Sequence, residues 1–457
     1  MQSKTIETYL QKGAKVHLVG IAGVSMAPLA EALLATGVQI TGSDLNENTV
    51  TKQLATLGIS VKIGHASQHV AGVDAVIRTA AAREDNPEIK AAREMGIPVF
   101  ERAQAWGYIM QQYQNAICIA GTHGKTTTTS MCTHILLAAD TDPTVMIGGN
   151  LAKLQAGHRV GGGDTIILES CEYYNSFHNF FPTIGVILNV EEDHLDYFKN
   201  LEEIQESFRK FANLVPEDGA IIGNGDDKKT MDALLPLNRD IWTFGFGKDN
   251  RVRAQNVVYK DIGSTFDLYV NDKFHCAVSL TVPGAHNILN ALAAISVALV
   301  LKLDTQAIQN GLADFTGAGR RFEYKGEYNG AVIYDDYAHH PTELAVLIDA
   351  VEKLDFKRTI FAFQPHTYTR TKALFDDFVQ QLKRPHLVYV AEIFAAREQN
   401  TVGISAKDVA DKVPGSKHME SLEKIAEEIR TIAQEGDLIL TVGAGDIFKV
   451  GEMLVVK

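Results

Sequence analysis

The chain is poor in cysteine and lacks long apolar runs. Its 457 residues include only Cys118, Cys132, Cys171 and Cys276, and no two of them have the C-x-x-C spacing of a zinc or redox site. This pattern argues against a disulfide framework and favours a reducing compartment. No stretch reaches the roughly eighteen apolar residues of a membrane span, and residues 1–15 lack the pattern of a signal peptide. We therefore expect a cytoplasmic protein with no membrane partner.

An excess of basic residues is also absent. The 43 Lys and Arg residues are outnumbered by 56 Asp and Glu residues, which gives a net charge of -13. A broad nucleic-acid surface depends on clustered basic residues, so we expect no nucleic-acid partner. Internal repeats and low-complexity segments are missing too, which excludes repeat architectures. The 46% hydrophobic residues are typical of a globular protein, and the length suggests three domains.

A glycine-rich turn stands out among the features that are present. Residues 117–129 read ICIAGTHGKTTTT, in which an apolar segment leads into a Gly-Lys-Thr turn. Backbone N–H groups of such a turn bind phosphate oxygens, Lys125 can neutralise the terminal phosphates, and Thr126 can ligate magnesium. We expect a helix to begin at Thr126 or Thr127. The general phosphate-loop pattern places its first glycine two residues before Gly121, so an ordinary strand-turn-helix connection remains an alternative.

A second turn lies near the start of the chain. Residues 16–26 predict a buried strand, a glycine turn and a helix, and Asp44 follows the next strand, where a ribose-binding carboxylate would lie. The dinucleotide fingerprint would require glycine at Ala22 and Ser25, so the fit to NAD is weak. The turn can still hold a nucleotide diphosphate. Alternating strands and helices predict a Rossmann-like domain over residues 1–112.

Acidic residues follow two further predicted strands. Glu169 comes directly after the strand at 165–168, and His194 follows the strand at 184–189 within an acidic segment. Ligands bind at the carboxyl ends of parallel strands, so both residues should lie near the phosphate loop. Glu169 suits magnesium. His194 is either a metal ligand or a structural hydrogen-bonding residue. The segment after these strands, residues 242–282, predicts a small antiparallel excursion.

Two amides and two arginines follow that excursion. Asn287 and Asn290 lie three residues apart on one face of a predicted helix and could bind an adenine edge, although Asn287 could simply cap the helix. Flexible residues 317–319 precede Arg320 and Arg321. Such a hinge could bring an arginine onto a phosphate.

The last part of the chain predicts a doubly wound α/β domain with two polar clusters. Each cluster, at residues 335–341 and 364–371, directly follows a predicted buried strand. Dense polar residues at strand ends indicate a site, whereas the alternative is that they cap the following helices.

In this order the motifs resemble those of the Mur ligase family, over nearly the whole chain. The residues that carry the resemblance are Gly121 to Thr126, Glu169, Asp193, His194, His286, Asn287, Asn290, Arg320, Arg321 and Asp336 to His339. The family's phosphate loop has the shorter Gly-Thr-x-Gly-Lys-Thr form, which accounts for the position of Gly121. The resemblance implies three α/β domains. These are a Rossmann-like UDP-substrate domain (1–112), a central P-loop ATPase-type domain (113–318) and a C-terminal amino-acid domain (319–457).

The resemblance also implies roles for single residues. ATP would be bound by Gly121, Thr122, His123, Gly124, Lys125, Thr126, Thr127, Asn287, Asn290, Arg320 and Arg321. Magnesium would be held by Thr126, Glu169 and His194. The UDP-substrate would contact Gly20, Ala22, Gly23, Val24, Ser25 and Asp44. The catalytic residues would be Lys125, Asp336, His339, His340 and Arg370. Several relatives hold a second metal with a carbamylated lysine, but we expect Lys210 to be a solvated surface residue.

The implied activity is that of an ATP- and Mg²⁺-dependent ligase. It would join L-alanine to the lactyl carboxylate of UDP-N-acetylmuramate through an acyl phosphate, for peptidoglycan synthesis, and act as a monomer or weak dimer. One alternative is a ligase that attaches a ready-made tripeptide to the same UDP-sugar during cell-wall recycling. Another is a non-catalytic phosphate-loop switch. A dehydrogenase built on residues 20–44 is a weaker alternative.

Overall fold

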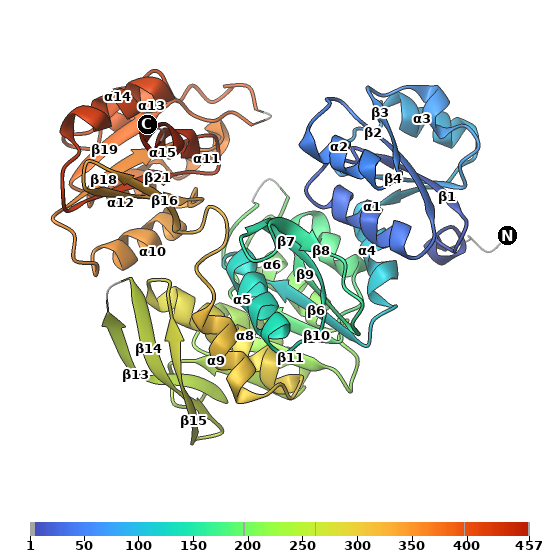
Figure 1. Cartoon of the computed structure of the whole chain (residues 1–457), viewed down its shortest axis with the longest axis horizontal. Helices are drawn as coiled ribbons and strands as arrows, with labels where there is room; N and C mark the ends of the chain where they lie inside the picture. The colour runs from blue at the N-terminus through green and yellow to red at the C-terminus, as the bar shows by residue number, and fades with distance from the viewer. Residues whose placement is uncertain (1–4, 195–196, 261, 397, 456–457) are drawn as a thin grey trace. The chain divides into compact units, whose positions relative to one another are not determined.

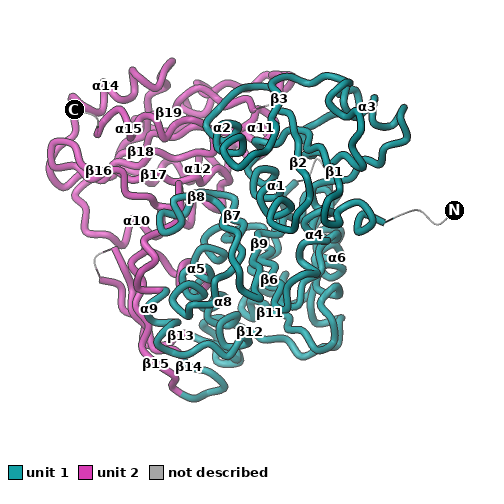
Figure 2. Tube along the Cα trace, turned by 45° about the vertical axis from the view of Figure 1, so that its right-hand side comes forward, with its two compact units in different colours: residues 1–253, 269–273, 291–311 teal, residues 254–268, 274–290, 312–457 magenta. Residues whose placement is uncertain are grey.

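The computed structural model describes residues 5–194, 197–260, 262–396 and 398–455. The chain divides into two compact units, coloured separately in Figure 2. Unit 1 contains residues 1–253, 269–273 and 291–311, and unit 2 contains residues 254–268, 274–290 and 312–457. None of the helices in the described part of the chain is both long enough and apolar enough to cross a membrane.

Unit 1 begins with a parallel five-stranded sheet. Its strands are β1 (Lys15–Val19), β2 (Gln39–Asp44), β3 (Ser60–Ile63), β4 (Ala75–Arg78) and β5 (Val99–Glu101). Its helices are η1 (Ile6–Thr8), α1 (Met26–Ala35), α2 (Thr49–Thr56), η2 (Ser67–Val70), α3 (Pro87–Glu94) and α4 (Arg102–Met110). The strand order β3-β2-β1-β4-β5 reverses direction at β1, and ligands of such sheets bind beyond the strand carboxyl ends at that reversal. The predicted Rossmann-like architecture is confirmed.

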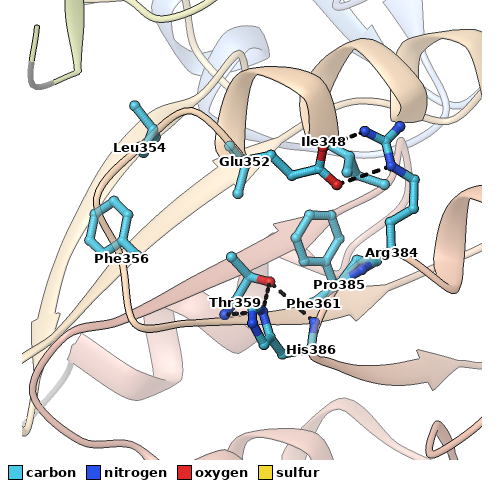
Figure 3. Close-up of a pocket in the computed structure, with 10 residues that line it drawn as sticks. Ile348, Glu352, Leu354, Phe356, Thr359, Phe361, Arg384, Pro385 and His386 are labelled. Atoms are coloured by element: carbon cyan, nitrogen blue, oxygen red, sulfur yellow. Dashed lines mark hydrogen bonds and ion pairs between the residues drawn. The ribbon is translucent and has the colours of Figure 1, made fainter.

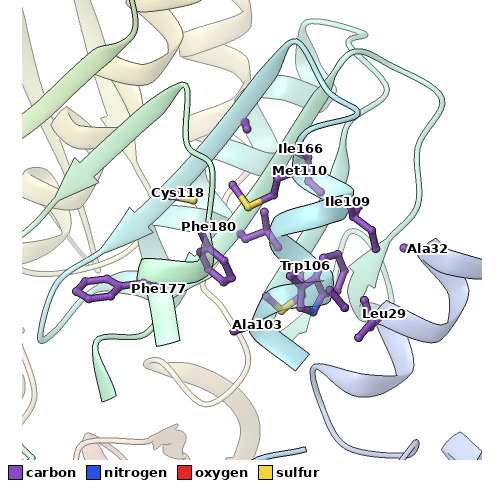
Figure 4. Packing of buried hydrophobic residues seen from close by; sticks show 14 of the residues in the cluster. Leu29, Ala32, Ala103, Trp106, Ile109, Met110, Cys118, Ile166, Phe177 and Phe180 are labelled. Carbon is purple, nitrogen blue, oxygen red and sulfur yellow. The ribbon is translucent and has the colours of Figure 1, made fainter. Parts of the chain in front are cut away.

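Helix α4 belongs to the largest buried core of unit 1. Figure 4 shows Trp106 of α4 facing Leu29 of α1, with Met110 one turn further along near Ile166. Trp106 is only 1% exposed, and its indole N–H donates to the carbonyl oxygen of Ser25 at 3.2 Å. A buried indole generally needs such a partner, so this bond fixes α4 against the start of α1.

The larger sheet of unit 1 surrounds β6 (Asn115–Ala120). The strands of this sheet that lie wholly in unit 1 also include β7 (Thr144–Leu151), β8 (Ala156–Arg159), β9 (Thr165–Ser170), β10 (Ile184–Ile187), β11 (Ala220–Asn224) and β12 (Ile241–Gly245). They run in the order β12-β11-β10-β6-β9-β7-β8, and only β8 runs antiparallel to its neighbour. The helices are α5 (Lys125–Ala138), η3 (Tyr173–Asn179), α6 (Leu201–Ala212), α7 (Lys228–Leu234), η4 (Leu235–Leu237) and α9 (Thr305–Ala313). Helix α5 packs on β6, β7 and β9 (Figure 1).

The prediction of an antiparallel excursion from residue 242 is wrong for its first strands. Strand β12 pairs in parallel with β11, and Phe244 and Gly245 pair in parallel with the start of β13 (Val252–Lys260). The glycine and aspartate residues after β12 resemble a hairpin turn in the sequence. In the structure, Asp226 accepts hydrogen bonds from the backbone of Phe246 and Gly247 and from Asn250 at 2.5, 3.1 and 2.6 Å. The loop therefore stays open, and no hairpin forms there.

Unit 2 contains β14 (Gly263–Val270), β15 (Lys273–Leu280) and the start of α8 (Ala285–Val300), followed by a six-stranded sheet. The strands of that sheet are β16 (Glu323–Tyr328), β17 (Ala331–Asp336), β18 (Arg358–Phe363), β19 (Leu387–Ala391), β20 (Lys417–Met419) and β21 (Asp437–Val442). The order is β16-β17-β21-β18-β19-β20, parallel except for β16. The helices are α10 (Pro341–Val351), α11 (Tyr368–Ala373), α12 (Phe375–Leu382), α13 (Ala406–Ala410), α14 (Leu422–Ile432) and α15 (Phe448–Val455).

Strand β18 shows why this sheet is covered on both faces. Phe361 and Phe363 are buried in a core that includes side chains of α10 and α12, whereas Ile360 and Ala362 are buried in a core that includes α14 and α15. Successive side chains of a strand point to opposite faces, so an uninterrupted apolar strand must have helices on both sides. The predicted doubly wound domain is confirmed.

Candidate functional site

The phosphate loop connects β6 to α5 in unit 1. Gly121 has a φ of 148° and Gly124 a φ of 84°, both in the region that favours glycine. A Cβ atom on Gly121 would also lie 2.9 Å from the Cβ of Leu188. Helix α5 begins at Lys125, one residue before the earlier of its two predicted starts. The loop therefore leads into the N-terminus of a fourteen-residue helix, whose free backbone N–H groups favour an anion such as phosphate.

Asn189, two residues after the end of β10, holds the phosphate loop in place. Its side-chain oxygen accepts from His123 N at 2.7 Å, and its side-chain nitrogen donates to His123 O at 3.1 Å. The Thr122 hydroxyl accepts from Glu191 N at 2.9 Å. Sequence reasoning did not single out Asn189, because only the tertiary pairing of β10 with β6 brings it to the loop.

Lys125 is held by a carboxylate that sequence reasoning passed over. Its Nζ donates to Gly121 O, to Thr122 O at 3.1 Å and to Glu172 Oε2 at 3.1 Å. The Glu172 side chain is only 3% exposed. Burial lowers the pKa of Lys125, but the facing Glu172 carboxylate outweighs burial and the pKa is raised. Lys125 is therefore a cation in this loop. Its partner could have been suspected from the Glu169 to Glu172 acidic cluster.

The predicted metal ligands Thr126 and Glu169 lie together. The Thr126 hydroxyl donates to Glu169 Oε2 at 3.1 Å, and the other carboxylate oxygen accepts from Gly148 N at 2.7 Å. His194 lies beside Glu172, with 3.9 Å between its Nε2 and Glu172 Oε1, and its ring stacks on Tyr173 at 4.3 Å. Within the described ranges, no three His, Cys, Asp or Glu side chains already converge as a metal site. A hydroxyl and a carboxylate at a phosphate loop do suit Mg²⁺, which takes its other ligands from water and substrate phosphates.

The N-terminal turn is shaped by the end of β2. Gly20 has a φ of 76°, and its N–H donates to Ser43 O at 2.8 Å. The Asp44 carboxylate accepts from Ala22 N at 3.0 Å, so this predicted ligand also fixes the turn. The remaining predicted contacts, Gly23, Val24 and Ser25, lie in the same turn before α1, and Val24 is 68% exposed.

The predicted adenine-binding amides lie in the first turns of α8. Asn287 donates to Pro283 O at 2.7 Å, and Asn290 donates to the side-chain oxygen of Asn287 at 3.2 Å. Each of the two residues is 7% exposed. Because α8 begins at Ala285, Asn287 lies inside the helix and is not its N-cap.

Arg320 is bonded within unit 2. Its guanidinium donates to Asp335 Oδ2 at 2.9 Å, to Gly443 O at 2.6 Å and to Gly445 O at 2.9 Å. It also lies 5.0 Å from the ring centre of Tyr337. Arg321 has looser contacts, with 3.7 Å between its Nη1 and a Glu343 carboxylate oxygen. Of the two predicted phosphate-binding arginines, Arg321 is the less constrained.

Asp336 and His340 are bonded to the backbone around them. The Asp336 carboxylate accepts from Phe322 N and Ala338 N, both at 2.8 Å, and burial raises its pKa to about 6. His340 is the N-cap of α10, where its Nδ1 accepts from Thr342 N at 3.3 Å. The alternative that this cluster caps a helix therefore holds for His340.

His339 and Arg370 belong to a more open cluster. The ring of His339 lies 5.7 Å from that of His366, and Arg370 Nη1 lies 3.5 Å from His366 Nδ1. Burial lowers the pKa of His339 despite the facing carboxylate of Glu343. Burial also lowers the pKa of His366, to about 4, with His339 and Arg370 adding to the effect. Both imidazoles are therefore neutral at pH 7. His366 lies inside a predicted polar cluster, but the sequence pattern did not distinguish it from its neighbours.

Two remaining features lie apart from these residues. A hollow of about 130 Å³ in unit 2 lies between α10 and β18 (Figure 3), and its lining includes Arg384, which is ion-paired with Glu352, and His386, which is bonded to Thr359. None of the predicted site residues lines it. Lys210 is 64% exposed on α6 beside Glu206, as predicted for a surface residue.

Family comparison agrees with this constellation. The sequence matches the Mur ligase family catalytic domain over residues 15–114, the Mur ligase middle domain over 119–298 and the Mur ligase glutamate ligase domain over 320–445. The chain belongs to the Mur ligase family.

Single relatives show which members of the family this chain resembles. The UDP-N-acetylmuramate--L-alanine ligase of Clostridium novyi is 45% identical over 443 residues, covering 96% of each chain. The enzyme of the same name from Clostridium acetobutylicum is 44% identical and covers 97% of this chain and 98% of its own length. Among solved structures, the UDP-N-acetylmuramate-alanine ligase of Thermotoga maritima superimposes with a TM-score of 0.80 at 28% identity, covering 96% of this chain and 98% of that one. A murein peptide ligase from Psychrobacter arcticus has a TM-score of 0.69 over 97% of this chain and 98% of its own, and its 24% identity supports the shared fold alone.

Proposed function

We propose that this chain joins L-alanine to the lactyl carboxylate of UDP-N-acetylmuramate and cleaves ATP to ADP and phosphate in the same cycle. The observation that carries this proposal is the grouping of Lys125, Thr126, Glu169 and Glu172 around the phosphate loop. It occurs in a chain that matches alanine-adding ligases over nearly its full length. We further propose a cytoplasmic monomer or weak dimer with domains at residues 1–112, 113–318 and 319–457.

The first chemical step activates a carboxylate. A carboxylate is a poor acyl donor. The terminal phosphoryl group of ATP is therefore transferred to an oxygen of the lactyl carboxylate, giving an acyl phosphate and ADP. The protein supplies mainly positioning and charge neutralisation for such a transfer. Loop N–H groups from residues 121–127 bind the phosphates, and the Lys125 ammonium moves its charge from Glu172 to the terminal phosphate. Asn287, Asn290, Arg320 and Arg321 are the proposed further ATP contacts.

Magnesium fits the donors at this loop. Thr126 and Glu169 would hold the ion, with His194 as the third proposed ligand. When bound, the ion supplies neutralisation of phosphate charge and a template for in-line transfer. The 3.1 Å separation of the Thr126 and Glu169 oxygens supports this assignment, because both oxygens already lie at one point of the loop.

The second step forms the amide. The amine of L-alanine attacks the acyl carbon, a tetrahedral oxyanion forms, and phosphate leaves. The attacking amine must be neutral, so a base has to accept the ammonium proton. His339 is the proposed base, because its lowered pKa keeps the imidazole neutral and able to accept a proton at pH 7. Asp336, His340 and Arg370 are the other proposed groups at this step, with Arg370 suited to a carboxylate.

A phosphate-release assay tests the proposal. Phosphate should appear only when ATP, UDP-N-acetylmuramate and L-alanine are all present. The tripeptide L-alanyl-γ-D-glutamyl-meso-diaminopimelate should not replace L-alanine. Release with the tripeptide but not with L-alanine would instead identify a recycling ligase. ATP binding without any substrate-dependent release would identify a nucleotide switch and refute the ligase proposal.

A further inference from the structure

Helix α3, next to the N-terminal sheet of unit 1, contains a buried carboxylate that neither proposed chemical step uses. Glu88, in the first turn of α3, is 0% exposed. Its carboxylate accepts from the hydroxyl of Ser43 at 2.6 Å and lies 2.7 Å from His69 Nδ1 and 2.9 Å from His65 Nδ1. The Nε2 atom of His17 lies 3.6 Å away. Three imidazoles and a hydroxyl therefore surround one carboxylate.

These partners keep Glu88 ionised despite its burial. Burial by itself raises the pKa of Glu88, but the facing His17 imidazole and the hydrogen bonds with Ser43 and His69 outweigh burial and lower the pKa to about 2. The position in the first turn of α3 adds to this, because a helix N-terminus favours negative charge. An apolar residue of similar volume would fill the same space without the desolvation cost of a buried charge. Packing alone therefore does not explain why a carboxylate occupies this position.

Two of the partners of Glu88 come from the carboxyl ends of strands in the sheet. Ser43 is the penultimate residue of β2, and His65 lies two residues beyond the end of β3. The carbonyl of Ser43 accepts from Gly20 N at 2.8 Å and from Ile21 N at 2.9 Å. Ser43 thus bonds to Glu88 through its side chain and to the N-terminal glycine turn through its backbone. Glu88 is two hydrogen bonds away from that turn.

We propose that Glu88 is a positioning residue for the UDP-sugar substrate and that it acts through Ser43. It fixes the Ser43 hydroxyl, and with it the carbonyl that sets the conformation of the turn at Gly20 and Ile21. The buried carboxylate does not itself touch the substrate. This inference rests on the proposed function, which assigns the turn to the UDP-substrate.

Steady-state kinetics of Glu88→Gln test the inference. Gln keeps the volume and one acceptor oxygen but removes the charge that orders the hydroxyl and the imidazoles. We expect the KM for UDP-N-acetylmuramate to rise by about tenfold, the effect of losing roughly 1.4 kcal/mol of substrate binding, while kcat and the KM for ATP change by less than about twofold. Calorimetric titration of UDP-N-acetylmuramate without ATP should show the same tenfold weakening. Glu94→Gln, at an exposed position on the same helix α3, is the matched control and should leave both KM values unchanged.

The route through Ser43 has its own test. Ser43→Ala removes the hydroxyl but keeps the backbone carbonyl, so it should raise the same KM by several-fold. The double variant should be no worse than Glu88→Gln alone, since residues that act in one network give non-additive effects. Ser43→Ala also decides the question if Glu88→Gln does not fold.

The outcomes separate this inference from the proposed function. If the wild type neither binds nor turns over UDP-N-acetylmuramate, the proposed function fails. If the wild type is active and Glu88→Gln leaves the KM for the UDP-sugar unchanged, the inference fails and Glu88 is only a structural charge. A fall in kcat together with a rise in both KM values would also show that Glu88 is only a structural charge. Additive effects in the double variant would refute the route through Ser43.

Discussion

The phosphate loop of unit 1 and the polar clusters of unit 2 use their charged residues in different ways. In the loop, Lys125 is bonded to the Glu172 carboxylate and to two carbonyls of its own turn, and Thr126 is bonded to Glu169. In unit 2, Arg320 is bonded to Asp335 and to carbonyls more than a hundred residues away in sequence. The Lys125 ammonium can leave its carboxylate for a phosphate group, because its other bonds stay within one turn. Bonds that join distant segments are part of the fold and are lost only at a cost in stability.

The phosphate loop was easier to interpret from the sequence than the polar clusters of unit 2. A glycine turn of fixed spacing before a helix has few purposes besides binding phosphate. Polar residues at strand ends have several, because they also cap helices and satisfy backbone groups. The comparison therefore makes opposite predictions for single substitutions. Changes at Lys125 should act most strongly on activity, whereas changes at Arg320 should act most strongly on stability.

The largest effect is expected for Lys125→Ala. Removing the ammonium group leaves the charge on the transferring phosphoryl group without its main protein cation, and kcat should fall by at least about 10³-fold. The affinity for UDP-N-acetylmuramate should stay the same. Phosphate release and calorimetric titration measure the two quantities. Lys210→Ala, an exposed lysine in the same unit, should have wild-type activity. Retained ATP-dependent turnover in Lys125→Ala would contradict the assignment of the loop.

The next effect concerns the stability of unit 2. Arg320→Ala leaves the Asp335 carboxylate, whose side chain is 1% exposed, without its ion-pair partner, and this should destabilise unit 2 by about 3 kcal/mol. Hydrogen exchange of β17 and β21 reports that loss locally. Arg321→Ala is the matched control, because its ion-pair distance is 3.7 Å and its side chain is 29% exposed. We expect it to lower activity and keep the exchange rates. Equal hydrogen-exchange rates in the two variants would show that Arg320 stabilises unit 2 no more than Arg321 does.

The fold could be predicted from the sequence wherever apolar strands alternate with helices. Strands such as β6 and β18 are almost wholly apolar, so their place in a parallel sheet follows from composition. Strands β3, β7, β8, β11, β16 and β20 were not predicted as such. Of these, β3, β8 and β20 are short segments at sheet edges, with the sequences SVKI, AGHR and KHM, and they are defined by pairing and not by their own side chains.

The site was predictable where the glycine turn or the first residue after a predicted strand indicated it. Thr126 and Glu169 were predicted to share a metal, and the structure brings them to within 3.1 Å of one another. Glu172 and Asn189 were missed because their contacts with the loop depend on the pairing of β6 with β9 and β10. Asn189 in particular carries no signal in its residue type. The structural bonds of Arg320 could not be foreseen either, since its backbone partners Gly443 and Gly445 lie more than a hundred residues away in sequence.

A pair of adjacent histidines sharpens the comparison within unit 2. His339→Ala should lower kcat by about 10²-fold, because the proposed base for the alanine ammonium is lost. His340→Asn should lower kcat much less, since asparagine is a preferred N-cap and can replace the bond to Thr342 N, so that only the direct contribution of the imidazole at this step is lost. Rates of amide formation at saturating L-alanine measure both. A large loss in His340→Asn together with an unchanged His339→Ala would exchange the two roles.

The smallest effect is a pH dependence that originates in unit 2. Burial lowers the pKa of His366 to about 4 in the folded protein, whereas an unfolded histidine titrates near about 6.5. Between these values the unfolded state binds the extra proton, so the stability contributed by the neutral ring is complete above about pH 6.5 and is lost as the pH falls toward 4. At pH 5 the wild type should have lost about 1 kcal/mol relative to pH 7, after solvent screening is allowed for.

His366→Gln isolates this contribution, because glutamine cannot take up the proton. Its unfolding free energy, measured by urea titration and by exchange in β18, should fall less than that of the wild type between pH 7 and pH 5. His286 also has a pKa lowered to about 4 by burial and remains in both proteins, so the difference between them reports on His366. Identical pH profiles would show that His366 is as easily protonated in the fold as in the unfolded chain, and the polar cluster around it would then be more open to water than its contacts with His339 and Arg370 suggest.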